Sequence, residues 1–302
     1  MKKNVLITGA NGMLASQVSK VLEMNDYQIR LLSRNSKPNF KNVYKWDIET
    51  GYIDEKALEN VNIIVHLAGA SVGEKRWTNS VKKEIKDSRV KGANLLFQKV
   101  FEKNIKLDAY ISASGISYYG SNTGDTWVDE QFAKGDGFLA DVVALWENAA
   151  EQFKLLADRV VKLRFGVILS SKSGLVKKML PIFKVGLGAP LGSGKQYISW
   201  VHESDAVNAI IHSIESFQVE GVYNIVSEKP VTNREFSKTL AKCINRPFLG
   251  INVPSLLIKG VLGEMSEIVL GGNRVCNKKS LDAGFYYLNN DLESTLYNLI
   301  SS

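Results

Sequence analysis

A buried strand, a glycine turn and the start of a helix follow one another near the beginning of the chain. Residues 5–7 form a short apolar run, typical of a parallel strand that is covered on both faces. Gly9 and Gly12 permit a tight turn, which leaves the first amide groups of a helix over 12–24 available to a pyrophosphate. Many strand-to-helix turns carry two glycines for steric reasons alone, so the next strand must decide whether a dinucleotide binds here.

The second predicted strand, over 28–32, ends in Ser33 and Arg34. A dinucleotide-binding fold places its ribose-recognition residue at this point. An acidic side chain would bind the 2′-hydroxyl of NAD, whereas a guanidinium presents a planar fork to a 2′-phosphate. We therefore expect NADP(H) as the cofactor. The alternative is that Arg34 only solvates the end of the strand.

Composition and charge exclude several other classes of protein. The chain has 302 residues, of which 45% are hydrophobic, and its net charge is +7. The lysines are scattered as short pairs without a nucleic-acid motif, so we expect a solvated surface, a small-molecule substrate and no nucleic-acid partner. Cys243 and Cys276 indicate neither a metal site nor a disulfide framework. No apolar run is long enough to cross a membrane, and a cytoplasmic protein is expected.

Strand and helix patterns alternate through the first half of the chain. We predict strands over 28–32, 43–47, 63–67, 109–114 and 160–169, and long helices over 78–103 and 139–156. Such alternation predicts an α/β fold with a doubly wound parallel sheet. The pattern breaks after Leu169. We therefore assign 1–168 with 198–217 to a dinucleotide-binding domain, and 169–197 with 218–302 to a smaller α+β substrate lobe.

Several ordered motifs together resemble the extended short-chain dehydrogenase/reductase superfamily, and more narrowly its atypical NAD-dependent epimerase/dehydratase subgroup. Members of this subgroup are called nucleoside-diphosphate-sugar epimerases or SulA-type cell-division inhibitors. The matching segments run over nearly the whole chain: 8–15, 66–70, 76–77, 88–90, 112–120, 146–147, 191–194, 200–202, 263–267 and 283–285. The resemblance implies a Rossmann fold, and by analogy a homodimer through the two long helices.

The resemblance also implies where the cofactor lies. The family's contacts to the pyrophosphate fall on Gly9, Asn11, Gly12, Met13 and Leu14, and its contact to the 2′-phosphate falls on Arg34. Its adenine contacts fall on Asp47 and Ile48, and the path to the nicotinamide is lined by Leu67, Ala68 and Gly69. Arg89 stands where the superfamily often has an asparagine. Because a guanidinium stays protonated, Arg89 suits an anionic substrate or a cofactor phosphate.

The superfamily's usual proton relay is missing. The relay pairs a Tyr with a Lys four residues later, and the Lys lowers the Tyr pKa. Here the corresponding positions are Trp146 and Ala150, which have no proton of useful pKa and no charge. A replacement must come from elsewhere in the same cleft.

Three residues are candidates for that replacement. Ser114 matches the serine at a strand end that binds a substrate oxygen, with Ser117 as a competing alignment. Tyr118, or Tyr119, could donate a proton, unless it is an aromatic packed beneath the loop. Glu147 is a candidate base, or a solvated carboxylate if its face of the helix is exposed.

Two functions remain open on the sequence. One is an NADP(H)-dependent oxidoreductase or epimerase-like enzyme that acts on a small anionic or sugar-like substrate with a non-standard proton donor. The other is a protein that keeps the dinucleotide fold without catalysis and reports the NADP(H) pool to a partner. No residues form a metal-ligand pattern.

Overall fold

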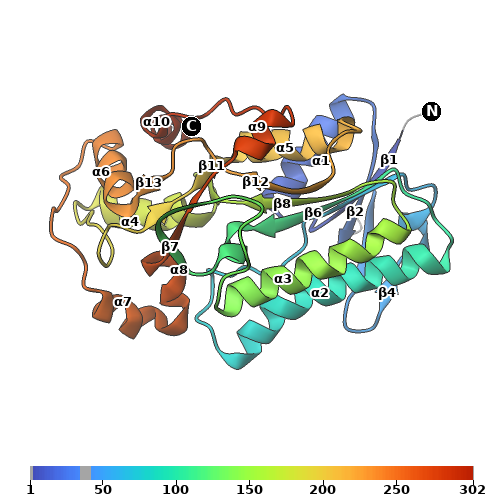
Figure 1. Cartoon of the computed structure of the whole chain (residues 1–302), viewed down its shortest axis with the longest axis horizontal. Coiled ribbons are helices and arrows are strands. Elements are labelled where there is room, and N and C mark those ends of the chain that lie inside the picture. Colours follow the sequence, from blue (N-terminus) through green and yellow to red (C-terminus); the bar gives the residue numbers. More distant parts are fainter. Residues whose placement is uncertain (1–2, 35–41, 302) are drawn as a thin grey trace.

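A parallel sheet forms the centre of the computed structural model, which describes residues 3–34 and 42–301 (Figure 1). In the described residues the sheet has eight strands, in the order β12, β8, β6, β5, β1, β2, β3, β4. The strands are β1 (Asn4–Thr8), β2 (Gln28–Ser33), β3 (Val43–Asp47), β4 (Tyr52–Ile53), β5 (Ile63–His66), β6 (Ala109–Gly115), β8 (Val160–Phe165) and β12 (Gly221–Ile225). Only β4 runs antiparallel to its neighbour among these strands. The predicted α/β fold with a doubly wound, mostly parallel sheet is confirmed.

Helices cover both faces of this sheet (Figure 1). One pair consists of α1 (Met13–Met24) and α5 (Glu203–Glu215), and the other of α2 (Asn79–Glu102) and α3 (Phe138–Glu151). Short 3-10 helices are η1 (Glu55–Leu58), η2 (Ile116–Tyr119), η3 (Gln152–Leu155) and η4 (Gly263–Ser266). Val5 and Ile7 of β1 join the core under α1 and α5, while Leu6 joins the opposite core. A strand that buries both faces explains why its sequence is continuously apolar.

A smaller lobe packs at one end of the sheet. Its elements are α4 (Gly174–Lys184), α6 (Asn233–Cys243), α7 (Ser255–Leu262), α8 (Glu267–Leu270), α10 (Leu292–Ser301) and the paired strands β10 (Tyr197–Ile198) and β13 (Val231–Thr232). Two further pairs join β7 (Asn122–Val128) to β14 (Gly272–Val275), and β9 (Val167–Leu169) to β11 (Trp200–His202). Helix α9 (Lys278–Asp282) lies against β12. Trp200, Phe236 and Leu296 are fully buried in the core of this lobe.

Two boundaries differ from the sequence-based expectation. Strand β12, placed above with the smaller lobe, pairs in parallel with β8 and completes the main sheet. The predicted strand over 160–169 is interrupted at Gly166, where a side chain would lie 2.4 Å from the Ser199 carbonyl oxygen. Beyond that point β9 leaves the main sheet and pairs with β11. Within the described residues no helix is long and apolar enough to span a bilayer.

Candidate functional site

The glycine turn after β1 lies where the strand order reverses between β1 and β5, the usual position of a ligand crevice in an open α/β sheet. Gly9 has φ +79°, and a Cβ there would lie 3.2 Å from the backbone nitrogen of Ala68. Gly12 donates from its backbone nitrogen to the Gly9 carbonyl oxygen at 2.7 Å and caps α1 without any side-chain hydrogen bond. The first amide groups of α1 are therefore open to an anion, as a pyrophosphate requires.

Thr8 fixes the segment that follows β5, and the sequence analysis did not single it out. Its Oγ1 accepts from the backbone nitrogens of Leu67 and Ala68, both at 3.0 Å, and lies 2.9 Å from Nδ1 of His66. A hydroxyl has two lone pairs, and here both accept hydrogen bonds from the amides. The hydroxyl proton is therefore left to donate to His66 Nδ1. Burial lowers the pKa of His66 to about 4, which keeps the ring neutral. A threonine at the end of an apolar strand, directly before the glycine, was the signal.

A cavity of about 470 Å³ runs along the carboxyl ends of β1, β2 and β5. Its walls include a majority of the predicted cofactor residues: Gly9, Asn11, Gly12, Arg34, Ile48, Leu67, Ala68 and Gly69. Arg34 is exposed at the end of β2, and Trp46 closes the adjoining wall. The structure thus collects these residues around one groove, whose open amides and cation fit a phosphorylated dinucleotide.

Other predicted cofactor residues do not line this cavity: Met13, Leu14, Asp47 and Arg89. Met13 and Leu14 occupy the first turn of α1, and Leu14 packs its side chain against the core. The Asp47 carboxylate accepts from the backbone nitrogens of Glu49 at 3.0 Å and Thr50 at 3.4 Å. These backbone hydrogen bonds lower the pKa of Asp47. Its side chain therefore stabilises its own turn.

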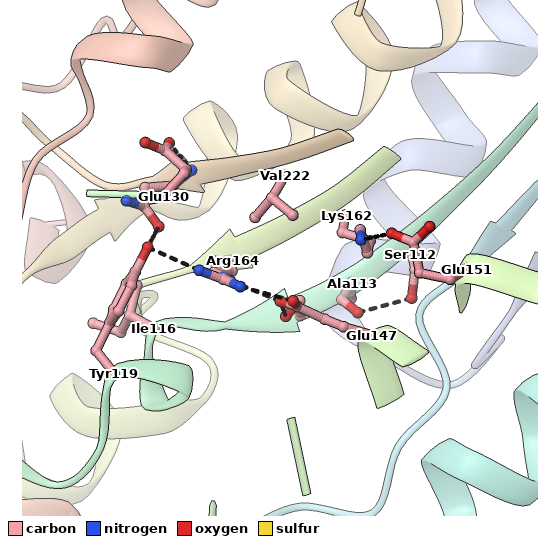
Figure 2. Close-up of polar contacts among 12 residues, drawn as sticks. Ser112, Ala113, Ile116, Tyr119, Glu130, Glu147, Glu151, Lys162, Arg164 and Val222 are labelled. Atoms are coloured by element: carbon pink, nitrogen blue, oxygen red, sulfur yellow. Dashed lines mark hydrogen bonds and ion pairs between the residues drawn. The ribbon is translucent and has the colours of Figure 1, made fainter. Parts of the chain in front are cut away.

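Ser114 and Glu147 are brought together by β6 and α3. The Ser114 hydroxyl donates to Glu147 Oε1 at 2.6 Å. Arg164, on the neighbouring strand β8, donates from Nε to Oε1 and from Nη2 to Oε2, both at 2.7 Å (Figure 2). Ser114 and Glu147 are each 6% exposed and Arg164 is 3% exposed. The alternative of a solvated Glu147 is therefore wrong, since this carboxylate is buried and accepts two hydrogen bonds from a guanidinium.

The same guanidinium continues the network to the loop after β6. Arg164 Nη1 donates to the Tyr119 hydroxyl at 3.0 Å (Figure 2). This hydroxyl donates in turn to Asn224 Oδ1 at 2.8 Å. Burial raises the pKa of Tyr119 to about 12. Tyr118 is half-buried, and the Arg164 guanidinium carbon lies 3.5 Å from its ring centroid. Of the two tyrosines, Tyr119 is thus the buried structural one.

Arg164 and Asn224 were not foreseen as site residues, although the sequence carried a signal for Arg164. Lys162 and Arg164 interrupt an apolar strand at alternate positions, while Glu147 and Glu151 are four residues apart on the preceding helix. In the structure Lys162 pairs with Glu151 and Arg164 pairs with Glu147 (Figure 2). Two basic residues on one face of a buried strand require acidic partners.

The positions of the missing relay are filled by groups without an acid or base. Trp146 is 6% exposed and its ring meets the His66 ring edge-on at 6.1 Å between centroids. Ala150 is fully buried in the core beneath α2. The Arg89 guanidinium carbon lies 5.2 Å from the Trp146 ring. Among the residues with described positions, no cluster of His, Cys, Asp or Glu could hold a metal ion.

A second cavity, of about 500 Å³, separates the start of α2 from the smaller lobe. Lys82 and Phe138 line it from the sheet side, and Lys259, Glu264 and Glu267 from the lobe. Lys82 forms an ion pair with Glu264 across it. This contact ties the lobe to the helix that borders the cofactor groove.

Comparisons with known proteins agree with this geometry. The model of the NAD dependent epimerase/dehydratase family matches residues 5–226, and that of a domain of unknown function, DUF1731, matches 253–299. Epimerase family protein ML0860 of Mycobacterium leprae is 34% identical over 98% of this chain and 95% of its own length. Epimerase family protein YfhF of Bacillus subtilis is 31% identical over 99% and 98%.

Solved structures show the same likeness. The crystal structure of human epimerase family protein SDR39U1 with NADPH is 28% identical, has a TM-score of 0.88 and covers 99% of both chains. The nucleoside-diphosphate sugar epimerase of Corynebacterium glutamicum is 25% identical, with a TM-score of 0.80, over 99% of this chain and 58% of its own. The chain therefore belongs to the NAD dependent epimerase/dehydratase family of the extended short-chain dehydrogenase/reductase superfamily.

Proposed function

We propose that this protein is an NADP(H)-dependent oxidoreductase or epimerase-like enzyme that acts on a small polar substrate. The observation that carries the proposal is the groove in which the glycine turn, the open start of α1 and Arg34 lie along one wall. A bound nicotinamide would supply hydride transfer. That the human relative was crystallised with NADPH supports the choice of the phosphorylated cofactor.

We assign the substrate oxygen to Ser114 of the buried network, and its proton to Tyr118, whose ring lies against Arg164. The Ser114 proton is committed to Glu147, so the lone pairs of Ser114 accept a hydrogen bond from a substrate hydroxyl. Glu147 positions Ser114, and Arg164 holds Glu147 at both oxygens. Tyr118 is half-buried, and its hydroxyl has no partner among the described residues, so we assign it the proton transfer.

Cofactor choice is tested by Arg34→Ala. Loss of a charged hydrogen bond, worth about 1.5–3 kcal/mol, should lower the affinity for NADPH by roughly 10- to 100-fold and leave the affinity for NADH unchanged. Fluorescence titration with both nucleotides measures this difference. Equal weakening of both would contradict the assignment of Arg34 to the 2′-phosphate.

Catalysis is tested by a screen of NADPH oxidation against carbonyl compounds and sugar nucleotides. Ser114→Ala and Tyr118→Phe should abolish any turnover found, while Ser117→Ala, which removes the competing serine, should retain it. Turnover that survives both of the first two changes would overturn these roles.

The buried Trp146 and Ala150 favour a second candidate, a protein that binds NADP(H) and reports its level without catalysis. Neither side chain can move a proton, and both oxygens of Glu147 are already engaged. Tight NADPH binding together with silence across the whole substrate panel would favour this function over the first.

A further inference from the structure

Arg89 on α2 carries a positive charge that no carboxylate neutralises within the described residues. Its Nη1 donates to the carbonyl oxygens of Ala70 at 3.0 Å and Ile85 at 2.9 Å, and its guanidinium faces the ring of Trp146. Burial lowers the pKa of Arg89 to about 10. A buried cation is costly unless an anion accompanies it, whereas carbonyl oxygens supply only partial charges.

The guanidinium lies directly against the wall of the cofactor groove. A Cβ on Gly69 would lie 2.9 Å from the guanidinium carbon of Arg89. Gly69 and Ala70 both line the groove. Nε and Nη2 of Arg89 have no hydrogen-bond partner in the described part of the chain. Neither belongs to the fully buried, unpartnered side-chain atoms found there, so each keeps a small accessible surface. Two donors of a planar fork therefore lie unpaired behind Gly69 and Ala70, although Arg89 itself is not among the residues that line the groove.

Other groups in the groove are suited to the phosphates of a dinucleotide. The open amides of α1 face the pyrophosphate position, and Arg34 stands at the end of β2. Arg89 lies on α2, against the segment that follows β5. Lys75 and Glu84, which also line the groove, lie 3.9 Å apart and balance one another. The charge on Arg89 is thus left for a different anion.

We propose that Arg89 binds the carboxylate of the substrate, and that the protein acts on small hydroxy or oxo acids. This inference rests on the proposed function, because it places the carboxylate beside the nicotinamide end of the groove. Arg89 is suited to this role because Nε and Nη2 match the two oxygens of a carboxylate. The Trp146 ring and the Ala70 carbonyl hold the fork in place.

The test measures binding without turnover. Pyruvate and its uncharged methyl ester are titrated by calorimetry into protein saturated with NADP⁺, and NADPH affinity and melting temperature are recorded for each variant. Arg89→Gln should lower the affinity for pyruvate by about 10- to 100-fold, the scale of a lost charged hydrogen bond. Lys86→Gln is the matched control, because it removes one positive charge from an exposed position of the same helix. It should change pyruvate affinity by less than twofold.

The outcomes separate this inference from the function beneath it. Pyruvate that binds more tightly than its ester, and only while Arg89 is present, supports the inference. Equal weakening in both variants, or equal affinity for acid and ester, overturns it and leaves the cofactor assignment intact. A parallel loss of NADPH affinity in Arg89→Gln shows that the residue only braces the groove wall, and also overturns it. Failure of the wild-type protein to bind NADPH refutes the proposed function itself.

Discussion

Replacing Arg164 with Met is expected to leave the Glu147 carboxylate buried without its cation. The pair is almost sealed from solvent, with 3% of the Arg164 side chain and 8% of the Glu147 side chain exposed. Although burial lowers the pKa of Arg164, its hydrogen bonds with Glu147 and the attraction between the charges raise that pKa overall. Removing one partner of a buried ion pair costs about 3–5 kcal/mol, so we expect a loss of this size.

The adjacent pair on the same two elements provides a matched control. Lys162 contacts Glu151 as Arg164 contacts Glu147, but the Glu151 side chain is 36% exposed. Solvent reaches Glu151, which also pairs with Lys154, so Lys162→Met leaves a hydrated carboxylate and should cost about 1 kcal/mol or less. Glu147→Gln, which leaves the Arg164 cation buried against a neutral amide, should cost several times more.

The measurement is urea unfolding followed by tryptophan fluorescence and circular dichroism, with the free energy of unfolding extrapolated to water. The double variant Glu147→Gln/Arg164→Met should be more stable than Arg164→Met alone, because it removes the stranded charge. Equal costs for Arg164→Met and Lys162→Met would refute the reasoning, as would an Arg164→Met variant that loses less than about 1 kcal/mol.

Further predictions concern the turn beside the groove. Gly9→Ala should lose about 1–2 kcal/mol of stability because of the positive φ, and it should also lose NADPH affinity because the new Cβ contacts Ala68. Gly51 has a similar φ and no atom within 4 Å of the position of an added Cβ, so Gly51→Ala should lose stability alone. Thermal melting and NADPH titration measure the two effects. Thr8→Val should lose about 2–3 kcal/mol because two amides and His66 lose their partner, whereas Thr8→Ser should stay near wild type in urea unfolding, and equal losses would contradict this role. Because burial lowers the His66 pKa from 6.5 to about 4, the unfolded chain takes up this proton first as the pH falls; stability should drop by about 3 kcal/mol between these values, and His66→Gln should flatten that part of the profile measured by pH-dependent unfolding.

The sequence by itself determined the α/β class and the position of the groove. Apolar runs and glycines are local signals, because a strand buried on both faces and a turn with positive φ each restrict the residue types that fit. Gly9 and Arg34 were therefore both predicted to contact the cofactor, and the structure places both along the same groove. The absence of a Tyr and Lys at positions 146 and 150 was equally visible in the chain.

Only the tertiary structure decided which side chains meet across elements. Strand order places Arg164 beside Ser114 and beneath Glu147, and the same order brings β12 into the main sheet so that Asn224 reaches Tyr119. These contacts depend on register between segments far apart in sequence, which no local pattern encodes. The lack of a carboxylate near Arg89 in the described residues is a fact of the same kind, since it requires knowing everything that packs around that helix.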